Sequence, residues 1–175
     1  HELHQNGCTV TTGDSELMFD AAGLPISWKF RGVDLIENSP AEQFMRGATD
    51  NDAIRCFIHT DERKTGYRWL ELYGLDNLKR KDSAAKFHTE NGALVIDSET
   101  VYTAKNKAKL SVRRTLSLLP AGALAVNLEF DVPEELDDLP RLGWTISMPK
   151  GFENFTFFGN GPEENYCDRH AGSIV

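Results

Sequence analysis

The chain has 175 residues and a formal charge of −8 at pH 7, and 40% of its residues are apolar. This apolar fraction is enough for a sizeable core, and a charged fraction of 26% is too ordinary for a disordered chain. An acidic protein repels phosphate backbones, so nucleic acid is excluded as a partner. No apolar run approaches the ~20 residues that a membrane helix needs, so we expect no membrane partner either.

The chain begins with His1, in a polar segment that lacks the features of a signal peptide. We therefore expect an excised domain or a processed product, and the compartment of the parent protein, cytoplasmic or periplasmic, stays open. The three cysteines (Cys8, Cys56 and Cys167) are too widely spaced for a disulfide framework or a zinc site. They are predicted to be free thiols.

Strand patterns dominate the sequence. Alternating apolar residues or short apolar runs predict strands, in chain order, at 17–19, 26–30, 94–96 with 101–102, 110–118, 124–130 and 155–158. In the 124–130 segment, the period of two predicts one buried face. The same period runs through 110–118, where Arg114 is the one break.

Short turn sequences separate several of these strands. Ala21-Ala22-Gly23, Asn91-Gly92 and Pro120-Ala121-Gly122 each favour a tight connection, and Asn-Gly readily adopts the positive φ angles of a hairpin turn. Neighbouring antiparallel strands with short connections predict an all-β sandwich or a large antiparallel sheet. We find no internal repeat or low-complexity linker, and we expect a single β-sandwich domain over 1–175.

One segment has helical spacing. Trp69, Leu72 and Tyr73 fall at i, i+3 and i+4, and Gly74 is suited to end a helix of about two turns. The stretch 49–65 has no clear period and many charges, which predicts a long loop of the kind that is often functional. The acidic segment 133–138 is predicted to be a solvated turn.

Familiar catalytic motifs are absent from the sequence. There is no Gly-x-Ser-x-Gly elbow, no phosphate-binding glycine loop and no His-Glu-x-x-His. Apart from His1 and His4 at the terminus, the histidines have no partner at metal-ligand spacing. A retaining glycosidase holds two carboxyl groups about 5–5.5 Å apart, and no pair of acids here is marked out for that role. We therefore predict no catalytic residue and no metal ligand in this chain.

Two polar segments stand out. In Phe44 to Asp52, the run Asp50-Asn51-Asp52 is expected to fix a loop, since short Asx side chains bond nearby backbone amides. Arg46 is placed to bridge these carboxylates in a fork geometry. Chemistry alone leaves two alternatives open: a turn that satisfies its own hydrogen bonds, or oxygens that bind a ligand or another domain.

The second polar segment runs from Gly159 to Arg169, where two glycines and a proline force a sharp turn after an aromatic stretch. We predict that its charged and polar side chains form an internal structural latch. The candidate latch residues are Glu164, Asn165, Tyr166, Asp168 and Arg169.

Both segments resemble motifs of the β-galactosidases of glycoside hydrolase family 2. The second matches Gly-x-Gly-Pro-x-Glu-Asn-Tyr-x-Asp-Arg, and the first is similar to Phe-Trp-Arg-Ala-Pro-Thr-Asp-Asn-Asp. Segments 67–78 and 139–143 resemble two intervening stretches of the family's C-terminal small-chain domain, so the resemblance covers the chain from about Thr9 onward. The first motif departs from the family at Met45 and at Gly47-Ala48, which leaves its loop shape and its ligand contacts open.

The resemblance implies a large antiparallel supersandwich like that of galactose mutarotase-like domains, truncated here and carrying one short helix. It also implies that the two catalytic glutamates lie on a separate (β/α)₈ barrel, against which this domain packs. The expected role is therefore a non-catalytic domain of a retaining β-galactosidase that helps to shape the pocket for terminal β-D-galactosides. Arg46, Asp50, Asn51 and Asp52 are the candidate pocket or loop residues.

The same resemblance implies no cofactor in this chain, and any Mg²⁺ or Na⁺ of the parent enzyme would be bound by other domains. The family's sandwich continues beyond the position of Val175, so we expect exposed strand edges and self-association of this fragment.

Two other functions stay open at this point. A self-standing carbohydrate-binding module would display Trp28, Trp69 or Trp144 as exposed, coplanar platforms. An enzyme related to mutarotases by fold would bring a histidine and a carboxylate together in one cleft.

Overall fold

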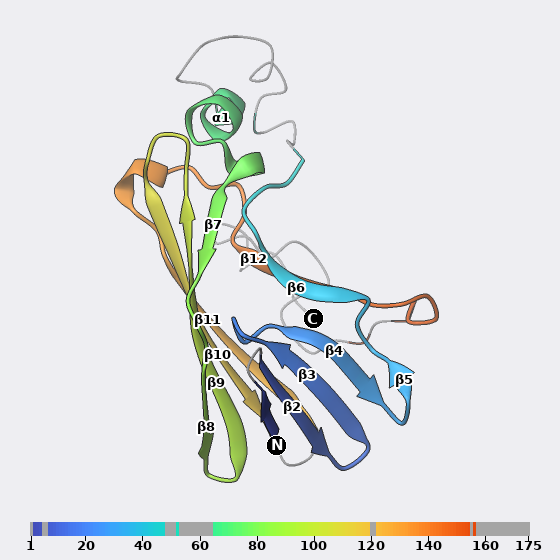
Figure 1. Cartoon of the computed structure of the whole chain (residues 1–175). Helices are drawn as coiled ribbons and strands as arrows, with labels where there is room; N and C mark the ends of the chain where they lie inside the picture. The colour runs from blue at the N-terminus through green and yellow to red at the C-terminus, as the bar shows by residue number, and fades with distance from the viewer. Residues whose placement is uncertain are drawn as a thin grey trace, which may run out of the picture.

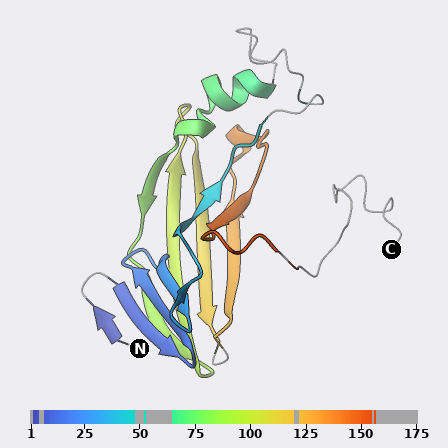
Figure 2. The same ribbon diagram turned by 90° about the vertical axis from the view of Figure 1, so that its right-hand side faces the viewer.

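The computed structural model describes residues 2–4, 7–47, 52, 65–119, 122–154 and 156. These residues form three open antiparallel sheets and a few short helical turns (Figure 1). The N-terminal five-stranded sheet and the two-stranded sheet lie on the same face of the second five-stranded sheet, which has the longer strands (Figure 2). The predicted class, an all-β antiparallel sandwich with one short helix, is confirmed.

The first sheet is a meander whose neighbouring strands follow one another along the chain. Its strands are β1 (Glu2–His4), β2 (Gly7–Thr12), β3 (Ser15–Asp20), β4 (Pro25–Phe30) and β5 (Val33–Asp34). The predicted strands at 17–19 and 26–30 are confirmed within β3 and β4. The predicted turn between them is also present: Gly23 has a φ of +75°, and the Asp20 carboxylate accepts hydrogen bonds from two backbone amides of the turn, each at 2.9 Å.

The second sheet contains the longest strands. It consists of β7 (Lys79–Asp82), β8 (Lys86–Glu90), β9 (Ala93–Thr103), β10 (Lys109–Leu118) and β11 (Leu124–Asp131). The order is β11-β10-β9, and β7 and β8 lie one after the other along the remaining edge of β9. Asn91 and Gly92 both have positive φ, 48° and 79°, as the hairpin prediction requires. Gly122, at φ +84°, lies in the predicted hairpin between β10 and β11.

The smallest sheet is a ribbon of β6 (Asn38–Gln43) and β12 (Gly143–Ser147), two segments that lie far apart in the sequence. Trp144 pairs with Glu42, and the register shifts after Thr145. No strand was predicted over 38–43, because Pro40 and the neighbouring polar residues disfavour one. The pairing with β12 supplies what local propensity lacks.

Two hydrophobic clusters cover the inner face of the second sheet. The sandwich cluster, between the first and second sheets, consists of Cys8, Val10, Leu17, Phe19, Leu94, Ile96, Leu116 and Leu118. The helical cluster, under the helical turns, consists of Phe44, Trp69, Tyr73, Leu75, Tyr102, Ala104, Leu110, Val112 and Leu136. Both clusters draw on β9 and β10, so these two strands connect the halves of the core.

The expected face of β11 is only partly buried. Leu124, Leu128 and Phe130 are half-buried, whereas Val126 is 40% exposed. Among the described strands, β11 is the edge of its sheet, so it has fewer neighbours than β9 or β10 to cover its apolar side chains.

The helical segment is present and has an unusual winding. It runs through α1 (Thr65–Tyr67) and η3 (Arg68–Leu72), and η3 is a π-turn in which the Tyr73 amide bonds to the Arg68 carbonyl at 2.8 Å. Trp69 and Tyr73 are buried as expected, but Leu72 is 39% exposed because the wider turn rotates it outward. Gly74, with φ +64°, ends the segment as predicted, before the 3₁₀ turn η4 (Leu75–Asn77).

The acidic connection 133–138 exposes Glu134, Glu135 and Asp137 as a solvated turn should, but Leu136 departs from the prediction. It contains the 3₁₀ turn η5 (Glu134–Leu136), in which Leu136 is 2% exposed. An apolar residue inside an otherwise acidic segment therefore anchors it to the helical cluster.

The predicted strand at 155–158 falls mainly outside the described residues, as does most of the predicted loop 49–65.

Candidate functional site

A bidentate ion pair joins Arg46 to Asp52 just beyond the end of β6. The two guanidinium nitrogens donate to the two carboxylate oxygens at 2.5 and 2.9 Å, so the predicted fork geometry is present. The Arg46 side chain is 30% exposed and that of Asp52 13%. A pair this well shielded holds its geometry better than an exposed surface pair.

Arg46 is held on its other sides as well. Its Nε donates to the Pro140 carbonyl oxygen at 3.0 Å, and its guanidinium carbon lies 5.4 Å from the centre of the Trp69 ring. The indole is 1% exposed, so this cation–π contact is made with an aromatic ring of the core. Arg46 thus connects Asp52 to η3 and to the segment before β12.

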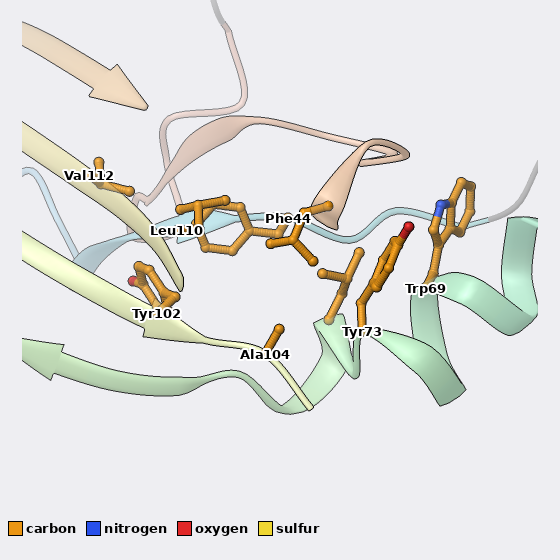
Figure 3. Close-up of a cluster of buried hydrophobic side chains, with 9 residues drawn as sticks. Phe44, Trp69, Tyr73, Tyr102, Ala104, Leu110 and Val112 are labelled. Atoms are coloured by element: carbon orange, nitrogen blue, oxygen red, sulfur yellow. The ribbon is translucent and has the colours of Figure 1, made fainter. Parts of the chain in front are cut away.

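The helical cluster packs beside Arg46 and supports its position. Phe44, two residues before Arg46, is 5% exposed and meets Tyr102 edge-on with ring centroids 4.9 Å apart (Figure 3). Trp69 and Tyr73 project from the helical turns into the same cluster (Figure 3). The backbone just before Arg46 is therefore attached, through Phe44, to a well-packed cluster of aromatic rings.

A second polar group secures the helical turns. Arg68 donates to the Tyr73 hydroxyl at 2.6 Å, and that hydroxyl donates to Asp137 at 2.7 Å. Arg68 also pairs directly with Asp137. This group ties η3 to the acidic connection, which explains why the connection is ordered around η5.

The predicted site residues are only partly covered by the structure. Arg46 and Asp52 are brought together, whereas Asp50 and Asn51 lie outside the described residues. The candidate latch residues, Glu164, Asn165, Tyr166, Asp168 and Arg169, also lie outside them, so the latch stays a prediction.

A fully buried polar group within the described residues was missed by sequence reasoning. Arg114 and Glu42 form an ion pair in which both side chains are 0% exposed. Tyr102 donates its hydroxyl proton to the other Glu42 oxygen at 2.6 Å. Arg114 was visible as the break in the alternation of β10, and an inward-facing arginine signals a buried carboxylate partner. The partner itself, 72 residues away, could not have been identified locally.

The tyrosines of these two polar groups should ionise late. Burial, then the hydrogen bond to Glu42 and its charge, raises the pKa of Tyr102, and burial, then the hydrogen bond to Asp137, raises the pKa of Tyr73. The folded state holds these protons more tightly than the unfolded chain does. The stability that these two protonated hydroxyls contribute is therefore fully present below about pH 10, the ordinary tyrosine pKa. It is lost as the pH rises towards the raised pKa values of the folded state.

Tyrosinate absorbance measured against pH checks this expectation. Tyr73 and Tyr102 should both titrate late in the folded chain, and Tyr102→Phe should remove one late transition. Ionisation of every tyrosine near pH 10, with circular dichroism unchanged, would contradict the buried geometry of both phenols.

The tryptophans do not form an exposed platform. Trp69 is 1% exposed, and Trp28 and Trp144 pack partly buried against the sandwich cluster. The indole nitrogens of all three are shielded from solvent. The structure therefore gives no support to a carbohydrate-binding module that stacks sugars on these rings.

A mutarotase-like cleft is not supported among the described residues either. His88 Nδ1 lies 3.7 Å from an Asp97 oxygen, but both side chains are nearly half exposed. A groove of about 500 Å³ lies on the outer face of the second sheet, lined by Asp97, Glu99 and Arg113 among others, and His88 is not in its lining. Within the same part of the chain, no group of three or more His, Cys, Asp or Glu side chains is arranged to hold a metal ion, and no helix is long and apolar enough to cross a membrane.

Comparison with known proteins decides the family. A family model described as "Beta galactosidase small chain" matches residues 11–175, nearly the whole chain. The chain belongs to the beta galactosidase small chain family. The expected resemblance is thereby confirmed.

Curated relatives of this small-chain domain carry the name beta-galactosidase. The Lactococcus lactis subsp. lactis protein is 29% identical over 95% of this chain, and the Lactobacillus delbrueckii subsp. bulgaricus protein is 30% identical over 87%. The Aeromonas hydrophila protein is 28% identical over 94%. The chain spans only 14–17% of the length of these relatives. The small-chain match therefore concerns a minor part of each relative.

Proposed function

We propose that this chain serves as a non-catalytic domain of a longer retaining β-galactosidase that cleaves terminal β-D-galactosides. Its family and the names of its relatives support this proposal, as does the small share of each relative that it matches. The family resemblance assigns the two catalytic glutamates to a separate barrel, which would be the main partner of this domain. Any Mg²⁺ or Na⁺ used by the enzyme would be held outside this domain.

The anchored Arg46–Asp52 pair is the observation that carries the proposed role. Both carboxylate oxygens of Asp52 accept hydrogen bonds from Arg46, so this acid is poorly placed to transfer protons to a substrate. The pair instead ties Asp52 to Arg46, whose guanidinium lies over Trp69 of the helical cluster. We infer that it positions the following loop at the galactoside pocket, by contact and not by proton transfer.

The isolated chain should not hydrolyse a β-galactoside. The physical reason is that the barrel with the catalytic glutamates is not part of these 175 residues. Purified chain at high concentration, incubated with a chromogenic galactoside, should give no turnover above the uncatalysed rate. Turnover that survives repurification and disappears when one acid of this chain is mutated would refute the accessory role.

In the longer protein translated from the complete reading frame, Arg46→Lys should impair catalysis. Lysine keeps the charge but loses the bidentate fork and the flat stacking surface on Trp69. We expect kcat/KM to fall by about 10- to 100-fold, since small displacements of a positioning group have effects of this size. Steady-state kinetics with a chromogenic galactoside measure the change.

Arg31→Lys is the matched control for this variant. Arg31 also pairs with a carboxylate, Asp14 at 2.7 Å, and also lies over an aromatic ring, but its side chain is 71% exposed. It should leave kcat/KM unchanged. Equal kinetics for both variants and wild type would show that the Arg46–Asp52 pair does not position the pocket.

A further inference from the structure

The Glu42–Arg114 pair lies at the centre of a polar chain that crosses the inner face of the second sheet. Arg114 donates to Glu42, to the Thr100 hydroxyl at 2.8 Å and to the Ser98 hydroxyl at 3.2 Å. Thr100 donates in turn to Asp82 on β7 at 2.6 Å. The guanidinium is thus held by three partners on β6 and β9, in an orientation that only an arginine can satisfy.

This polar chain separates the two hydrophobic clusters. Along β10, Arg114 lies between Val112 of the helical cluster and Leu116 of the sandwich cluster. An apolar side chain at this position would join the clusters into one continuous core. A fully buried ion pair is often no more stabilising than apolar residues of similar volume, so stability alone does not account for it.

The ribbon gives the pair a different role. Among the described strands, β6 pairs through its backbone only with β12 and not with either five-stranded sheet. Its attachment to the second sheet depends on side chains, chiefly Glu42 and Phe44. A slip of one residue along β6 would turn Ala41 or Gln43 towards Arg114, and neither carries a charge. The buried guanidinium therefore accepts only one register of β6.

The register of β6 determines the position of Arg46. Arg46 follows Glu42 by four residues, with Phe44 fixed between them against Tyr102. We propose that Glu42 and Arg114 are positioning residues, whose ion pair selects the register of β6 and so places the Arg46–Asp52 pair. The link to catalysis rests on the proposed function of that pair, whereas the link to its geometry does not.

A double variant separates positioning from simple stabilisation. Glu42→Leu combined with Arg114→Met replaces the pair by apolar residues that fit a core, and we expect the chain to remain folded with a similar melting temperature. The Arg46 Nε proton, which bonds the Pro140 carbonyl, should lose about tenfold or more of its protection from hydrogen exchange. NMR of the chain measures this proton directly. In the longer protein, kcat/KM should fall by about 10- to 100-fold.

The control is the neighbouring pair on the opposite face of the same strand. Arg113 and Glu129 are 62% and 58% exposed, so Arg113→Met with Glu129→Leu removes an ion pair without touching β6. It should alter neither the exchange of Arg46 nor the kinetics. If the first double variant does not fold, Glu42→Gln with Arg114→Gln removes both charges and keeps polar side chains, and it should show the same loss of protection.

The outcomes separate the two proposals. Wild-type protection of Arg46 in either folded double variant of Glu42 and Arg114 would overturn the positioning role. Lost protection with wild-type kinetics in both the double variant and Arg46→Lys would uphold positioning and refute the proposed function of the pair. Impaired kinetics in Arg46→Lys alone would uphold the proposed function and refute positioning by Glu42 and Arg114.

Discussion

Glu42→Leu alone should lower the free energy of unfolding by about 3–5 kcal/mol, because it leaves a buried arginine without its counter-charge. The Arg114 side chain is 0% exposed, and its remaining partners are the neutral hydroxyls of Ser98 and Thr100. These hydroxyls satisfy hydrogen bonds but do not balance the charge. Urea denaturation followed by circular dichroism measures the loss.

Glu129→Leu provides the comparison for this variant. It removes the partner of Arg113 from an exposed pair, for which a change of about 0–1 kcal/mol is expected. Adding Arg114→Met to Glu42→Leu should recover most of the lost stability. A loss below about 1 kcal/mol for Glu42→Leu would mean that water reaches Arg114 and that the pair is not sealed in the core.

Trp69→Ala should have a comparable effect, about 3–5 kcal/mol, because it removes the largest side chain of the helical cluster. The cavity would open in the helical cluster beside η3, and Arg46 would lose the ring over which its guanidinium lies. Thermal or urea unfolding of the variant gives the magnitude.

Leu72→Ala tests whether burial causes this effect. Leu72 lies in the same π-turn but is 39% exposed, so its truncation should cost no more than about 1 kcal/mol. If both variants lost the same stability, the cost would come from the winding of the turn and not from the packing of Trp69.

Local patterns were enough to predict five of the ten strands in the two five-stranded sheets, namely β3, β4, β9, β10 and β11. The alternation in β10 and the Asn91-Gly92 turn are properties of a few neighbouring residues, and both are confirmed. The helical spacing of Trp69 and Tyr73 was also sufficient, although the π-turn that exposes Leu72 was not foreseen. Such a turn depends on how the segment docks, which spacing alone does not encode.

The features that were not predicted depend on contacts between distant segments, which local sequence patterns do not reveal. β6 has weak strand propensity and owes its extended form to β12, and Glu42 has no local feature that marks it as buried. For the candidate site, the fork between Arg46 and Asp52 was predicted from residue chemistry, since the two residues are only six apart. The contacts of Arg46 with Trp69 and Pro140 bring distant segments together and required the structure.

The ribbon of β6 and β12 also has a consequence for the order of folding. The Thr145 hydroxyl bonds the Ala41 carbonyl across 104 residues of chain, whereas β2 to β4 and β9 to β11 close through short hairpins. Bringing such distant segments together costs more chain entropy than closing a hairpin, and contacts of this kind slow folding. The hairpins should therefore form first and the ribbon last. Arg46 then gains its contact with Pro140 only once the ribbon has formed, so the surroundings of the Arg46–Asp52 pair are completed late in folding.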